Sequence, residues 1–133
     1  MPVGTRREAR ERALGLLYEA DAKQQDPQQV LDELPVAPDP FVVELVQGVQ
    51  SRTAEIDPLI SASSIDWALP RMPVVDRTVL RMAIWELLAR TDVPIGVIIS
   101  EAVELAKRYS TEESGRFVNG VLASVAAKVR PGE

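Results

Sequence analysis

Apolar side chains recur every three or four residues along most of the chain, which is the spacing of one face of an α-helix. The segment 111–129 shows this most clearly, and its apolar stripe consists of Val118, Val121, Leu122, Val125 and Val129. The corresponding row near the N-terminus consists of Ala9, Ala13, Leu16, Leu17 and Ala20. No segment alternates apolar and polar residues as a half-buried strand does, so the pattern predicts an all-α fold.

Prolines and capping residues indicate where the helices begin. Thr5 with Glu8, and Ser110 with Glu113, match the capping box, in which both residues satisfy free backbone donors at a helix start. Asp-Pro pairs at 26–27, 39–40 and 57–58 combine an N-cap residue with proline at the first helical position. We therefore expect a helix after Thr5 and further helices over 27–34, 40–56, 73–90, 94–109 and 111–129, with a short helix restarting at 58 and one more turn at 66–70.

The helix over 73–90 carries apolar residues in almost every direction, so we expect it to be the central element, buried around most of its circumference. The apolar side of 94–109 consists of Ile98, Ala102, Leu105, Ala106 and Tyr109. With 133 residues, 46% of them hydrophobic, the chain has the size of one domain that buries about two-thirds of its unfolded surface. We expect a compact bundle of six to seven helices in a single domain, 1–133, without internal repeats.

Composition removes most catalytic chemistry. The chain has no cysteine and no histidine, which excludes disulfides, thiolate nucleophiles and the commonest general base and metal ligand. The carboxylate pairs Glu101/Glu104 and Glu112/Glu113 lack a third ligand nearby in sequence and match solvated helix surface. We expect no enzyme activity, no metal and no cofactor. The chain also has no signal-peptide pattern and no apolar run of about 18 residues, so we expect a cytoplasmic protein without membrane contact.

Phe117 departs from the apolar stripe of its helix. It lies about 100° away from that stripe, with Arg116 beside it and the helix N-terminus close by. An exposed ring next to a guanidinium is suited to stack an unpaired base. Packing of Phe117 against a neighbouring helix is the alternative that periodicity leaves open.

Four arginines gather at the other end of the chain, within residues 6–12. Steps of three and four place Arg6, Arg10 and, less closely, Arg7 on one side of the first helix, opposite its apolar row. Cations near a helix N-terminus are mildly unfavourable for the helix, which suggests a use outside the fold. An ordinary solvated face is the alternative.

The charge distribution limits how such a protein could bind nucleic acid. The net charge is −5, with +2 in residues 1–12, −8 in 13–66 and +1 in 67–133. Non-specific binding of nucleic acid relies on neutralising its phosphates, which an acidic protein does poorly. Any RNA contact must therefore be local, on the first and last helices, and a basic partner would supply further positive charge.

Two residues could meet such a partner. Asp76 lies in the first turn of the helix over 73–90, in line with Leu80, Ala83 and Leu87. Tyr18 continues the apolar row of the first helix and could place its hydroxyl at the surface. The alternative for Asp76 is a carboxylate that only stabilises the helix dipole. The alternative for Tyr18 is a tyrosine of the hydrophobic core.

Three ordered motifs resemble the NusB family of bacterial transcription antitermination factors. They are 6–18 (RREARERALGLLY), 75–88 (VDRTVLRMAIWELL), and a third in two pieces, 92–107 followed by 117–122 (FVNGVL). The resemblance covers about residues 5–130 and implies two packed three-helix subdomains within one unit. The sequence departs from the family pattern in two places. Glu8 interrupts an arginine tract, and Gly115 stands where a larger polar residue can occur. Both departures bear on RNA affinity.

The resemblance implies roles for specific residues. Positions matching Arg6, Arg7, Arg10, Arg116 and Phe117 belong to the surface that binds the boxA RNA element. Positions matching Tyr18 and Asp76 lie at the contact with NusE, a ribosomal protein that is also an antitermination factor. The implied function is a non-enzymatic adaptor that holds boxA-like single-stranded RNA of ribosomal transcripts together with NusE and acts on elongating RNA polymerase with other Nus factors.

Two other functions remain open from the sequence. The same fold serves as the RNA-binding module of ribosomal RNA methyltransferases, although this chain has no glycine-rich cofactor segment. A helical interaction module without an RNA role is the third hypothesis. The family contains monomers and dimers, so the resemblance also leaves a homodimer open.

Overall fold

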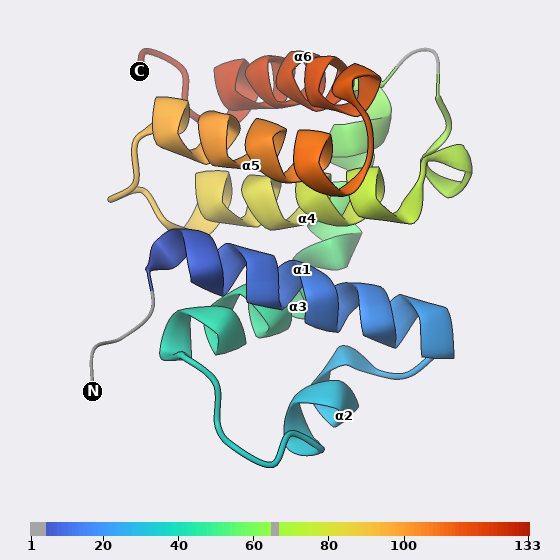
Figure 1. The fold of residues 1–133 in the computed structure, drawn as a ribbon. Helices are drawn as coiled ribbons and strands as arrows, with labels where there is room; N and C mark the ends of the chain where they lie inside the picture. The colour runs from blue at the N-terminus through green and yellow to red at the C-terminus, as the bar shows by residue number, and fades with distance from the viewer. Residues whose placement is uncertain (1–4, 65–66) are drawn as a thin grey trace.

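The computed structural model describes residues 5–64 and 67–133, which form six α-helices and one 3-10 turn, with no strand in these two ranges (Figure 1). The elements in chain order are α1 (Arg6–Lys23), α2 (Pro27–Asp32), α3 (Pro40–Ser63), the turn η1 (Leu69–Arg71), α4 (Val74–Ala89), α5 (Ile95–Tyr109) and α6 (Glu112–Val129). The expected all-α bundle of six to seven helices is confirmed. No helix in the described ranges is long and apolar enough to cross a membrane.

The helices form two groups of three. Helices α1, α2 and α3 pack against one another, as do α4, α5 and α6, and the groups meet mainly where α3 and α1 pack on α4 (Figure 1). This arrangement confirms the two expected three-helix subdomains. Helix α4 contacts α1, α3, α5 and α6, and ten of its residues are buried, so its expected central position is confirmed.

Local sequence correctly predicts three helix starts. Thr5 and Glu8 form a complete capping box, in which the Glu8 amide donates to Thr5 Oγ1 at 3.1 Å and the Thr5 amide donates to Glu8 Oε1 at 3.2 Å. Asp26 and Asp39 each accept a hydrogen bond of 2.8 Å from the backbone two residues later. These side chains satisfy amide groups that have no partner inside the helix.

Three boundaries differ from the prediction. Helix α3 continues through Pro58 instead of ending at 56 and restarting, because Ile56 and Ile60, both fully buried, hold the turns on either side against the core. The N-cap of α6 is Thr111 rather than Ser110, and its hydroxyl accepts from the amide of Ser114. The turn expected at 66–70 is found at Leu69–Arg71, and residue 66 lies outside the described ranges.

The C-terminal end of α4 is held by a buried arginine that directly follows α6. The guanidinium of Arg130 donates to the carbonyl oxygens of Leu87 (2.8 Å), Arg90 (2.8 Å) and Glu86 (3.1 Å), and to that of Val93 in the following loop (2.7 Å). The last carbonyls of a helix have no partner within the helix, and a cation there also favours the helix dipole. Arg130 therefore fixes the α4–α5 connection on which α5 is positioned.

Candidate nucleic-acid interface

Phe117 of α6 packs against Trp67, which follows α3 in the chain. Their ring centroids lie 5.3 Å apart with planes at 88°, an edge-to-face arrangement. Phe117 is half-buried, while Trp67 remains 38% exposed. The partner of Phe117 is thus an exposed aromatic ring outside any helix, and the pair forms an aromatic corner at the surface.

A recess of about 400 Å³ opens beside this corner. It is lined by Ser63, Ser64, Trp67, Arg116, Phe117, Gly120 and Val121, from the end of α3, the connection after it, and α6. Sequence reasoning missed Trp67, because it lies between helices, where periodicity says nothing about burial. The only signal was a large aromatic residue within the short turn expected at 66–70.

Arg6 and Arg7, at the start of α1, are exposed as expected. The Arg7 guanidinium donates to both carboxylate oxygens of Glu101 on α5, with Nε 3.2 Å from each, and this hydrogen bond raises the pKa of Arg7. Arg6 lies over the ring of Phe41, 4.3 Å from its centroid. Both side chains reach the surface, although a phosphate would compete with Glu101 for Arg7.

The expectation that Arg10 lies on an exposed cationic stripe is wrong. Its side chain is only 5% exposed, and Nε and Nη2 donate to the two carboxylate oxygens of Glu86, each at 2.8 Å. Nη1 lies 3.8 Å from Glu101. Helical spacing correctly places Arg10 near Arg6, but α4 and α5 cover that position and supply its acidic partners. Arg10 is therefore unavailable to a phosphate in this structure.

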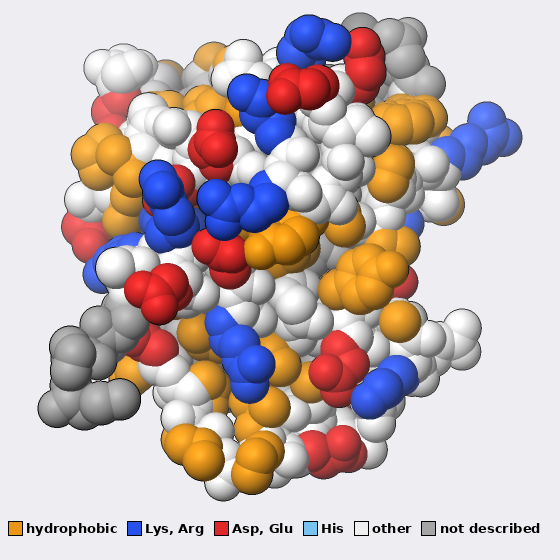
Figure 2. All heavy atoms as spheres, in the orientation of Figure 1, with side chains coloured by type: hydrophobic (Ala, Val, Ile, Leu, Met, Phe, Trp, Pro, Cys, Tyr) orange, Lys and Arg blue, Asp and Glu red, His pale blue; other side chains and the backbone are white. Residues whose placement is uncertain are grey.

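The N-terminal arginines and the aromatic corner do not form one continuous surface. In Figure 1, α4 and α5 both lie between α1 and α6, and α5 is the nearer of the two to α6. The side chains of α5 towards this region include Glu101, Glu104, Lys107 and Arg108, and Figure 2 shows Lys and Arg interspersed with Asp and Glu over this face. The expectation of a surface made by the first and last helices alone is thus corrected, because α5 must be crossed.

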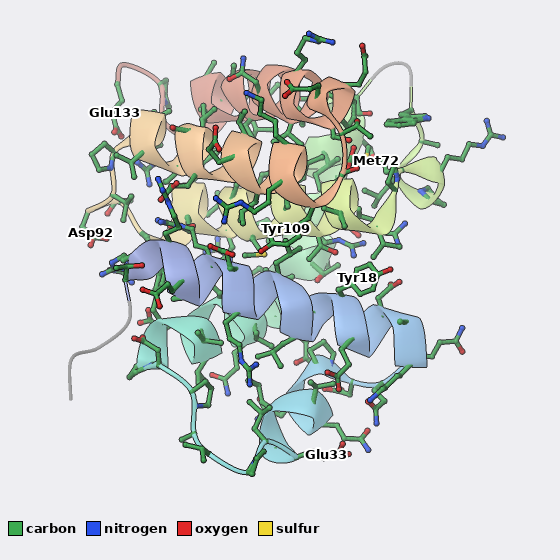
Figure 3. All side chains as sticks on the ribbon, viewed as in Figure 1. Tyr18, Glu33, Met72, Asp92, Tyr109 and Glu133 are labelled. Atoms are coloured by element: carbon green, nitrogen blue, oxygen red, sulfur yellow. The ribbon has the colours of Figure 1, made fainter. Side chains whose placement is uncertain are left out.

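Tyr18 is exposed, so the alternative of a core tyrosine is wrong. It lies on α1 on the same face as Tyr109, the last residue of α5, and the two side chains are 47% and 48% exposed (Figure 3). Tyr109 was expected on the apolar side of its helix; instead its hydroxyl donates to Glu11 Oε2 at 2.6 Å. A second recess, of about 440 Å³, is lined by Glu11, Leu14, Gly15, Tyr18, Val75 and Tyr109.

The expectation of an accessible carboxylate at Asp76 is wrong. Asp76 is fully buried, and among the described residues neither of its carboxylate oxygens has a hydrogen-bond partner. It follows Val75, which lines the recess with Tyr18, so it lies behind that surface rather than on it. A buried carboxylate without partners is costly to the fold.

Three of the four remaining acidic candidates have cationic neighbours. Glu101 binds Arg7, Glu113 binds Arg116 at 2.8 Å, and Glu112 lies 3.9 Å from Lys107. Among the described residues, no group of three or more acidic side chains is arranged to hold a metal ion. Glu101 and Glu112 therefore pair with cations of a neighbouring helix, and Glu113 pairs with a cation of its own helix.

Both departures from the family pattern have a structural use. Glu8 completes the capping box of α1. Gly115 is buried where α6 approaches α5, and a Cβ atom there would lie 2.5 Å from Cγ of Lys107. A side chain at Gly115 would therefore require Lys107 to move.

Comparison with known proteins identifies relatives along nearly the whole chain. The NusB family model matches residues 7–127. The transcription antitermination protein NusB of Acidothermus cellulolyticus is 50% identical over 131 residues, covering 96% of this chain and 89% of the relative.

Two solved structures extend the comparison to the fold. T. maritima NusB superimposes with a TM-score of 0.85 at 40% identity, covering 96% of this chain and 94% of the other. A structure of antitermination factors NusB and NusE in complex with double-stranded RNA matches with a TM-score of 0.79 at 28% identity. The match covers 92% of this chain and 96% of the other.

Proposed function

Because this chain belongs to the NusB family of transcription antitermination proteins, we propose that it binds boxA-like single-stranded RNA of ribosomal transcripts together with NusE. The pair then acts on elongating RNA polymerase with other Nus factors, in the cytoplasm. Members of this family are non-enzymatic antitermination factors, in agreement with the composition of the chain.

The observation that carries the RNA proposal is the aromatic corner of Phe117 and Trp67 with Arg116 at its edge. Unpaired bases stack on aromatic rings, and guanidinium groups bind phosphates. We assign Arg6 and Arg7 to phosphates at the other end of the RNA path. Arg10 contributes indirectly, because its buried pair with Glu86 fixes the helix that carries Arg6 and Arg7.

The partner proposal rests on the recess beside Tyr18. Two tyrosines, each about half exposed, flank an apolar depression, and such amphipathic rings are typical anchors of protein interfaces. We assign this recess to NusE. The buried carboxylate of Asp76 lies behind this recess and has no hydrogen-bond partner among the described residues. We infer that a basic group of NusE neutralises it when docking opens the first turn of α4.

Titrations with three ligands test the proposal. We expect boxA-like single-stranded RNA to bind more tightly than a scrambled RNA of equal length, and NusE to increase that affinity. Equal binding of both RNAs, with and without NusE, would contradict the RNA part. Calorimetry that detects no NusE binding would contradict the partner part.

A single substitution addresses the partner surface. A Cβ atom at Gly15 would meet nothing within 4 Å, so a side chain has room to start there, and we expect Gly15→Leu to fill the recess. We expect it to lower NusE affinity tenfold or more, about 1.4 kcal/mol, while RNA binding by the isolated protein stays unchanged. Asp76→Asn is the conservative variant for the carboxylate, because a lysine there would bury an unpaired charge.

A further inference from the structure

We propose that the recess beside Phe117 is a pocket for one unpaired nucleobase, with Trp67 as its second aromatic wall. The inference rests on the proposed RNA function and deepens it, since it names where one base sits and which residues select it. It also extends the RNA surface from α6 to the end of α3 and the segment after it.

The ring geometry suits a flat heterocycle. With planes at 88° and centroids 5.3 Å apart, the two rings present one face and one edge at right angles. A base stacked on one ring can meet the edge of the other, which is the favourable arrangement for aromatic pairs. The recess, at about 400 Å³, lies within the size range of ligand pockets.

Trp67 is held in position by a buried serine. Ser64 is 7% exposed, and its hydroxyl donates to the Trp67 carbonyl oxygen at 2.7 Å. This hydrogen bond fixes the backbone while the ring stays 38% exposed. A ring that is anchored but left exposed costs little conformational entropy when a ligand stacks on it.

Polar groups at the border match the edges and backbone of a nucleotide. The Ser63 hydroxyl lies 2.9 Å from Ser124 Oγ and 3.5 Å from Lys128 Nζ, and it can donate or accept. Arg116 lines the recess with a mostly exposed guanidinium, and its only partner among the described residues is the still more exposed Glu113, with which a phosphate would compete. Two cations at this border, in a protein of net charge −5, favour an anionic ligand with a flat apolar part.

Gly120 explains why the recess is open. It lies inside α6, where glycine weakens a helix relative to alanine, and a Cβ atom there would meet nothing within 4 Å. No neighbouring residue therefore requires glycine at this position. What glycine provides is free space in the lining of the recess, so a larger side chain would occupy the volume of the base.

The first experiment uses two matched glycine variants. Gly120→Leu should keep or raise the melting temperature and lower the affinity for boxA-like RNA tenfold or more. Gly96→Leu on α5, equally unhindered at its Cβ position and outside both recesses, should leave RNA affinity within twofold of wild type. Wild-type RNA affinity in a folded Gly120→Leu protein would overturn the pocket.

The second experiment pairs a protein change with an RNA change. Each nucleotide of the RNA is replaced in turn by an abasic one, and binding is measured with wild type and with Trp67→Leu. One abasic position should cost wild type about tenfold but cost the variant less than threefold. A uniform loss across all oligonucleotides in the variant would show that Trp67 is only structural, and would overturn its assignment.

Tryptophan emission gives a direct readout. The chain has two tryptophans, and Trp85 is buried at 7% exposure, so RNA should protect mainly Trp67 from acrylamide quenching. Unchanged quenching in the RNA complex would contradict stacking. These results are distinguishable from failure of the proposed function, because in that case wild type itself would not prefer boxA-like RNA.

Discussion

Arg10 and Glu86 form a buried, bidentate ion pair that joins α1 to α4. Both hydrogen bonds are 2.8 Å long, and the two side chains are 5% and 3% exposed. The backbone oxygen of Glu86 also accepts from Arg130, which directly follows α6, at 3.1 Å, so α1, α4 and the end of α6 meet at one residue. An arginine that the sequence suggests for RNA binding is therefore part of the interior.

Arg10→Met should destabilise the protein strongly, because it leaves the Glu86 carboxylate buried without its charge partner. Breaking one side of a buried pair costs about 3–5 kcal/mol, whereas replacing both partners with apolar residues is often close to neutral. We expect the double variant Arg10→Met/Glu86→Leu to recover most of the lost free energy of unfolding. Urea unfolding followed by circular dichroism measures both; a double variant as unstable as the single one would refute this view of the pair.

Gly48 of α3 should tolerate no side chain, because α3 lies directly against Trp85 there. An added Cβ atom would fall 2.1 Å from Nε1 of the Trp85 ring. We expect Gly48→Ala to lower the free energy of unfolding by about 1–3 kcal/mol through overpacking. Gly15→Ala is the matched control and should instead stabilise its helix by about 0.5–1 kcal/mol. Thermal unfolding that ranks the two variants equally would contradict this close approach.

Replacing Arg6 and Arg7 with alanine should weaken RNA binding through lost phosphate contacts. Each contact to single-stranded RNA contributes about 0.7 to the slope of log affinity against log salt, so the double variant should flatten that slope by up to about 1.4. The preference for boxA over scrambled RNA should remain. Arg52→Ala on α3, whose partner is Glu55, is the control. An unchanged slope in the double variant would mean that these arginines are only solvated surface.

Tyr109 should titrate at higher pH than an ordinary tyrosine. Its hydrogen bond to Glu11 requires the protonated phenol and so raises the pKa of Tyr109 above its usual value near 10. The stability that this bond provides is complete below about pH 10 and is lost as pH rises through the raised pKa. With Tyr18→Phe, Tyr109 is the only tyrosine, and absorbance at 295 nm reports its ionisation. Adding Glu11→Ala should move that titration to lower pH, and an unmoved titration would contradict the bond.

The helix starts that the sequence predicts correctly depend only on residues close by in the chain. The caps at Thr5, Asp26 and Asp39 depend on neighbours two or three residues away, so the sequence alone locates them. Pro58 is the instructive failure: its local preference is to begin a helix, but burial of Ile56 and Ile60 on either side keeps α3 continuous. Tertiary packing decides such positions.

The site was only partly predictable, for a related reason. Helical periodicity correctly gives the direction of Arg10 and Asp76 on their helices, but not which other helix covers that direction. Burial of Arg10 follows from Glu86, 76 residues later in the chain. Trp67 belongs to a connecting segment, and its contact with Phe117 exists only once α3 and α6 are packed. Pairings of this kind require the three-dimensional arrangement.

Helices α4 and α5 separate the two ends of the proposed RNA surface. Adjacent helix axes lie about 8–10 Å apart, so a strand that reaches from Arg7 across α5 to Phe117 would span at least about 16–20 Å. On the proposed function, an RNA long enough to cover this distance engages both ends, whereas a shorter one engages a single end. Its middle would then lie over the mixed acidic and basic side chains of α5.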